Sequence, residues 1–154
     1  STSLQYSYHY NNPNTLENSG EEYTKGKTQA GTDYYYRYGN MLCIVLDTNN
    51  YNCATHENVI KKAISENEDA TWKVVMFHQD IYGSGLDHSD SDGMILRTQL
   101  TPIMDKYDID VVLQGHDHVY LRTDAMIANA VVPSTSSMTE FDGLEGSYQL
   151  QRNL

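Results

Sequence analysis

Two histidines spaced two residues apart follow a buried-strand pattern in the second half of the chain. His116 and His118 lie in the segment Gly115-His116-Asp117-His118, directly after the mainly apolar run 109–114. Because side chains of an extended segment repeat every two residues, both imidazoles are expected to point to the same side. Neutral imidazole nitrogens are good ligands for zinc, iron and similar metals. The spacing therefore predicts a metal-binding position at the end of this strand.

A third histidine closes a similar apolar run upstream. His78 follows the segment 72–77, which has the composition of a strand covered on both faces. Open α/β sheets keep their ligands at the carboxyl ends of their strands. We therefore expect the side chains of His78, His116 and His118 to converge on one or two metal positions.

The elements that must position these residues alternate along the chain. Strands are predicted within residues 1–12, 34–47, 74–77 and 111–113, and a turn and loop fill residues 13–33. Helices are predicted over 55–68 and 96–107, the second with a break at Thr101-Pro102. After the first strand, the order is β-α-β-α-β, which favours an α/β fold with mostly parallel buried strands.

Composition narrows the class of protein. The chain has 154 residues and a net charge of −11, which disfavours nucleic acid as a partner because nucleic acid binding requires clustered Lys and Arg. No apolar run is long enough to span a membrane. Cys43 lies in an apolar strand pattern and Cys53 in the polar stretch after it; a disulfide between them is left open. His9 and His56 fit no motif and are expected at the surface.

The strand-end motifs are similar to those of a known family. Val75-Met76-Phe77-His78 and Gly115-His116-Asp117-His118 resemble the last two metal-binding motifs of calcineurin-like metallophosphoesterases. The purple acid phosphatase branch is the most similar, because Tyr38-Gly39-Asn40 precedes a strand, His88 follows His78 by ten residues, and Arg122-Thr123 follows the last motif. The resemblance covers residues 1–123.

This resemblance implies a fold and a set of roles. Residues 1–123 would be the carboxyl-terminal half of a catalytic domain with a four-layer α-β-β-α sandwich, and residues 124–154 a divergent tail of it. The centre would be dinuclear, with iron beside iron, zinc or manganese. His116 would bind one metal together with His78, and His118 the other. Asp87 and His88 would face a small phosphoester substrate, with His88 binding phosphate or protonating the leaving alkoxide.

The family's amino-terminal aspartate and asparagine-histidine motifs do not occur in the sequence. The remaining ligands would then come from an amino-terminal half or a second chain, and one side of the strand at 41–46 or 74–77 is expected to be exposed and apolar. Two alternatives follow: a non-catalytic module with this fold that acts in binding, and a mononuclear site built from His78, His116 and His118. Family resemblance also implies an exported protein.

Overall fold

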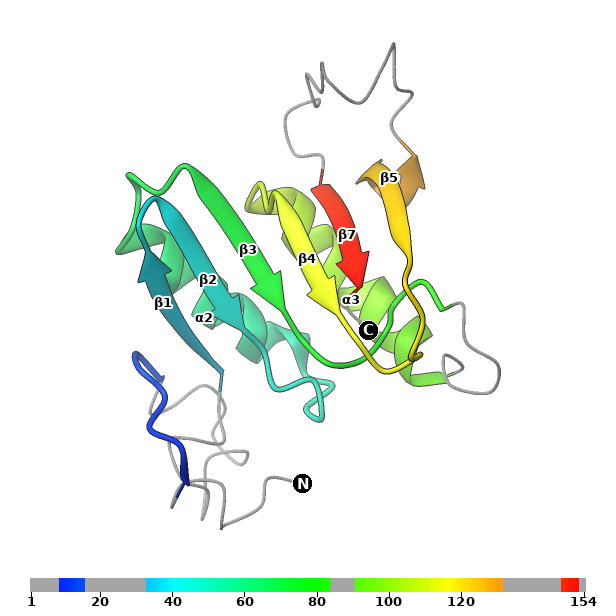
Figure 1. Ribbon diagram of the computed structural model, residues 1–154, viewed down its shortest axis with the longest axis horizontal. Helices are drawn as coiled ribbons and strands as arrows, with labels where there is room; N and C mark the ends of the chain where they lie inside the picture. Colours follow the sequence, from blue (N-terminus) through cyan, green and yellow to red (C-terminus); the bar gives the residue numbers. More distant parts are fainter. Residues whose placement is uncertain (1–8, 16–32, 84–90, 132–147, 153–154) are drawn as a thin grey trace. The chain divides into compact units, whose positions relative to one another are not determined.

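The structure is a computed structural model that describes residues 9–15, 33–83, 91–131 and 148–152, the last range as backbone only (Figure 1). The chain divides into two compact units, residues 1–77 and residues 78–154. Within the described parts, no helix is long and apolar enough to cross a membrane.

Residues 33–77 of the first unit contain three strands and one helix. Strands β1 (Tyr34–Tyr38) and β2 (Met41–Val45) form an antiparallel hairpin, and β2 pairs in parallel with β3 (Trp72–Met76). Gly39 in the hairpin turn has a φ of 60°, a conformation that glycine adopts at no steric cost. Helix α2 (Cys53–Ser65) connects β2 to β3 and packs on β1 and β2.

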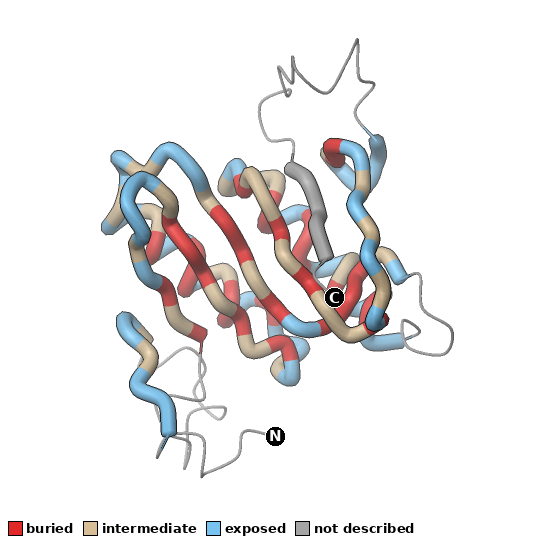
Figure 2. The backbone as a smooth tube through the Cα atoms, viewed as in Figure 1, coloured by how far each residue is buried: buried red, intermediate tan, exposed pale blue. Residues whose placement is uncertain are grey.

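The core of this unit runs through β2 and β3. Leu42, Cys43 and Ile44 are all buried, although neighbouring strand residues point to opposite faces (Figure 2). Val74 and Val75 of β3 are buried in the same way. The expectation that one side of these strands would be exposed and apolar is therefore wrong, since both faces of β2 are covered.

The described part of the second unit contains helix α3 (Ser91–Lys106) and four strands: β4 (Val111–Gln114), β5 (Arg122–Ile127), β6 (Ala130–Val131) and β7 (Tyr148–Arg152). Strand β7 lies between β4 and β5, parallel to β4 and antiparallel to β5. Strands β5 and β6 form a hairpin whose two turn residues, Ala128 and Asn129, both have positive φ. That conformation is typical of two-residue hairpin loops.

The predicted β-α-β-α-β order is confirmed by β2, α2, β3, α3 and β4, and the mixed α/β class with parallel buried strands is confirmed with it. The predicted break at Pro102 is wrong, because α3 runs through it without interruption. Proline costs a helix one backbone hydrogen bond. Burial of Leu100, Ile103 and Met104 around it, with the Thr101 hydroxyl donating to the Arg97 carbonyl at 2.9 Å, outweighs that loss.

The structure also tests the predictions for the amino-terminal segment and for the two cysteines. Residues 10–12 have no strand structure, whereas the turn predicted at 11–14 is present and includes Asn14 with a φ of 51°. The rest of the strand predicted in residues 1–12 lies outside the described residues. Cys43 and Cys53 are both buried and both free, so they form no disulfide with each other.

Candidate metal centre

The loops after β3 and β4 bring two histidines into contact. His116 Nδ1 lies 3.2 Å from His78 Nε2, and the two rings meet edge to face with centroids 5.1 Å apart. Two nitrogens bound to one tetrahedral zinc, each at about 2.0–2.1 Å, stand about 3.3–3.4 Å apart. The observed separation is therefore close to that of two ligands on one metal ion.

The surroundings of His78 favour its neutral form. Partial burial lowers the pKa of the His78 imidazole, and the positive charge that His116 and His118 carry when protonated lowers it further. A neutral imidazole offers a lone pair to a metal, whereas an imidazolium does not. The lowered pKa of His78 thus favours the form of that ring that can bind a metal.

The segment carrying His116 and His118 is not extended as expected. Strand β4 ends at Gln114, and His116 and His118 have φ values of 76° and 52°. The inference that strand alternation would align the two imidazoles is therefore wrong. Residues other than glycine rarely adopt a positive φ, and such backbone conformations often occur at functional sites.

His118 does not complete a three-histidine cluster with the pair. Among the described residues, no three side chains of His, Cys, Asp or Glu are placed as a metal-ligand set. The mononuclear alternative built from His78, His116 and His118 stays a prediction. His118 is close enough to His78 for its charge, when protonated, to lower the pKa of that ring.

The two substrate-side candidates, Asp87 and His88, lie outside the described residues. Asp80 lies four positions before residue 84, where the undescribed segment 84–90 begins. It is 1% exposed, and its carboxylate accepts a hydrogen bond from the Tyr82 amide at 3.0 Å. Asp80 therefore shapes the loop that follows His78.

Hydrogen bonds from the end of β4 hold that loop. The Gly115 amide donates to the His78 carbonyl oxygen at 3.0 Å. The side-chain oxygen of Gln114 accepts a hydrogen bond from the Ile81 amide at 3.2 Å. Sequence reasoning did not identify Gln114; a polar residue at the buried end of an apolar strand is the signal that could have found it.

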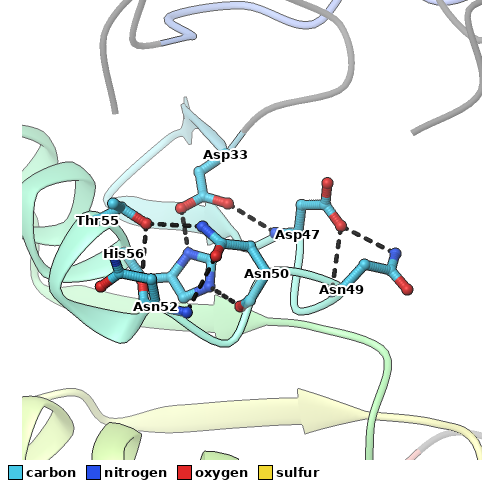
Figure 3. Close-up of polar contacts among 7 residues, drawn as sticks. All are labelled: Asp33, Asp47, Asn49, Asn50, Asn52, Thr55 and His56. Carbon is cyan, nitrogen blue, oxygen red and sulfur yellow. Dashed lines mark hydrogen bonds and ion pairs between the residues drawn. The ribbon is translucent and has the colours of Figure 1, made fainter. Parts of the chain in front are cut away.

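A second polar cluster, in the first unit, was also missed (Figure 3). His56 on α2 is 1% exposed, so its expected surface position is wrong, whereas His9 is exposed as expected. His56 Nδ1 lies 2.5 Å from the Asp33 carboxylate, and Nε2 lies 2.9 Å from the Asn50 carbonyl oxygen. The other Asp33 oxygen accepts a hydrogen bond from the Asp47 amide at 2.7 Å. The cluster ties the loop after β2 to the start of β1.

The imidazoles of His78 and His116 thus lie on loops at the carboxyl ends of strands, where open α/β sheets bind their ligands. The family model for calcineurin-like phosphoesterases matches residues 3–120. The chain therefore belongs to the calcineurin-like phosphoesterase family.

A solved structure shares the fold. The purple acid phosphatase PPD1 from yellow lupin (Lupinus luteus) seeds superposes with a TM-score of 0.59 at 16% sequence identity. The match covers 81% of this chain and 23% of the lupin chain, so this chain spans under a quarter of that protein's length. Comparison with curated proteins gave no match.

Proposed function

We propose that this chain forms part of a metal-dependent phosphoester hydrolase that acts on small phosphomonoesters at a dinuclear centre. The observation that carries the proposal is the contact between His78 Nε2 and His116 Nδ1 at 3.2 Å. Membership in the calcineurin-like phosphoesterase family supports phosphoester hydrolysis as the reaction. We further propose that residues 1–123 are the carboxyl-terminal half of the catalytic domain and residues 124–154 its divergent tail.

In this proposal the pair of histidines binds one metal ion. The donors fit such an ion in part: two neutral imidazoles supply two ligands, and a complete site needs more. His118 would contribute to the second metal. Iron beside iron, zinc or manganese is the proposed metal content. The remaining ligands would come from an amino-terminal half or from a second chain.

When bound, the metal ions would polarise the phosphoryl oxygens and supply a water with a pKa near neutrality. The protein's own part is to hold imidazole nitrogens at fixed positions and to place a proton donor near the leaving group. We assign that donor role to His88, with Asp87 beside it on the substrate side. The net charge of −11 would repel an anionic phosphoester, so the bound cations would also provide the local attraction.

Metal binding by the purified chain tests the assignment. Zn²⁺ titration by calorimetry should show a site that is lost in His78→Ala and in His116→Ala. His9→Ala is the matched control, because His9 is exposed and is not part of the pair, and it should bind as the unaltered chain does. Equal zinc binding in the double variant His78→Ala/His116→Ala would contradict the proposal.

A non-catalytic module remains the second candidate, since no three-residue ligand set is present among residues 9–15, 33–83 and 91–131. Hydrolysis of p-nitrophenyl phosphate by the full-length protein, dependent on added metal, separates the two functions. Binding of metal without hydrolysis would favour the module. By family resemblance we also propose an exported protein; the amino-terminal sequence of the full-length precursor tests this directly.

A further inference from the structure

The loop from His78 to Tyr82 is held between β4 and α3. From the β4 side, it accepts the Gly115 amide and donates the Ile81 amide to Gln114, as described above. From the α3 side, Arg97 donates to the Ile81 carbonyl oxygen at 3.3 Å. The loop position therefore depends on side chains and backbone that lie outside the histidine pair.

The Gln114 side chain links the segment that carries His116 to the loop that carries His78. Gln114 is the last residue of β4, two positions before His116, and is 5% exposed. Its side-chain oxygen accepts the amide of Ile81, three positions after His78. A buried amide that lost this acceptor would be left unsatisfied, which proteins avoid. The hydrogen bond therefore fixes the end of β4, which leads to His116, relative to the loop that follows His78.

Gly93 of α3 packs closely against the same loop. A Cβ atom added at Gly93 would lie 2.5 Å from the backbone carbonyl oxygen of Asp80. Because the clashing atom is backbone, the loop itself would have to shift. The close approach of α3 at this point thus leaves the loop no room to move toward the helix.

We propose that Gln114 is a positioning residue that sets the spacing of His78 and His116 for metal binding. The proposal rests on the proposed function, because it concerns the same pair of imidazoles. Partners that orient metal ligands typically change metal affinity by about 10- to 100-fold when they are removed. The Gln114 side chain reaches the backbone of the His78 loop and does not touch the metal position itself.

The test compares three variants of the whole chain. Gln114→Met keeps the length of the side chain and removes the acceptor. Gln114→Glu keeps an acceptor oxygen; the lost amide nitrogen has no hydrogen-bond partner within the described part of the chain, so no bond is lost with it. Val112→Ala is the control: Val112 is fully buried in the same strand and its truncation lowers stability without touching the loop.

Two readouts separate positioning from stability. In the metal-free protein, the nuclear Overhauser contact between the His78 and His116 rings should disappear in Gln114→Met and persist in Gln114→Glu and Val112→Ala. The Zn²⁺ affinity should fall about 10- to 100-fold in Gln114→Met and stay unchanged in Val112→Ala. Gly93→Ala, which displaces the loop from the α3 side, should weaken the ring contact in the same way.

A ring contact that persists in Gln114→Met would overturn the proposal, and so would an equal loss in Val112→Ala. If Gln114→Met loses the ring contact but keeps its zinc affinity, Gln114 holds the loop without serving the site, and the proposal is again wrong. If the unaltered chain binds no zinc, the proposed function fails, whereas the ring contact still decides whether Gln114 positions the pair.

Discussion

The buried pair of Asp33 and His56 should make stability depend on pH in a direction that can be worked out from its contacts. The Asn50 carbonyl can only accept, so His56 Nε2 donates to it. Nδ1 faces the Asp33 carboxylate at 2.5 Å. A ring that donates from both nitrogens is an imidazolium, here 1% exposed and paired with a carboxylate that is 4% exposed.

The sign follows from the pKa. Burial lowers the pKa of His56, but the hydrogen bond and the charge of Asp33 outweigh burial, with the Asn50 carbonyl and the charge of Asp47 adding to them. The folded pKa is thus raised above the ordinary value of 6.5. The stability that this proton contributes is fully present below about pH 6.5 and is lost as pH rises through the folded pKa. Within that window the free energy of unfolding should fall by about 1.4 kcal/mol per pH unit.

Two substitutions separate the charge from the packing. Asp33→Asn keeps the shape, and its amide can donate to Nδ1 of a neutral His56 while its oxygen still accepts the Asp47 amide. This variant should lose the fall in stability above pH 6.5. His56→Ala leaves the Asp33 carboxylate buried without its partner, and removal of one member of a buried pair costs about 3–5 kcal/mol.

Urea unfolding followed by circular dichroism between pH 5.5 and 9 measures both effects. The free energy of unfolding is plotted against pH for the unaltered chain and for Asp33→Asn. The difference between the two slopes gives the contribution of the Asp33–His56 pair, because the other titrating groups are the same in both proteins. His9→Ala, at an exposed position, should match the unaltered chain. The same slope in Asp33→Asn as in the unaltered chain would refute the reasoning, as would a cost below about 1 kcal/mol for His56→Ala.

Two further predictions concern a turn and the substrate side. Gly39→Ala should lower the free energy of unfolding by about 1–2 kcal/mol, because φ is 60° there and no atom within 4 Å adds a clash; an unchanged urea midpoint would contradict it. If the proposed function holds, His88→Ala in the assembled enzyme should keep its metal and lower turnover by about a hundredfold to ten-thousandfold on alkyl phosphates, with little effect on nitrophenyl phosphate. Equal losses on both substrates would instead mean that His88 positions the phosphate.

The order of helices and strands could be predicted from the sequence because buried segments have a clear pattern of apolar residues. Met41 to Leu46 and Val74 to Phe77 are continuous apolar runs; the first contains β2, and the second overlaps the last three residues of β3. Pro102 misled the prediction, since local propensity disfavours proline in a helix and burial of the apolar residues beside it overrides that preference. Local sequence does not report such packing.

The sequence predicted which histidines lie at the candidate site, but it did not predict the backbone conformation that places them. The apolar run before each histidine led to His78 and His116, which the structure brings together. Their contact does not arise from strand alternation, because His116 has a φ of 76°. Gln114 and His56 act through partners 33 and 23 residues away in sequence, and no local pattern encodes such pairs. Backbone conformation and long-range hydrogen bonds therefore mark the limit of the sequence prediction.

A crystal structure of the chain soaked with Zn²⁺, with the metal located by anomalous scattering, tests the central claim most directly. We expect one zinc position about 2.0–2.1 Å from both His78 Nε2 and His116 Nδ1. Zinc bound only elsewhere on the chain, with these two nitrogens free of metal, would contradict the assignment of the pair as ligands of one metal ion.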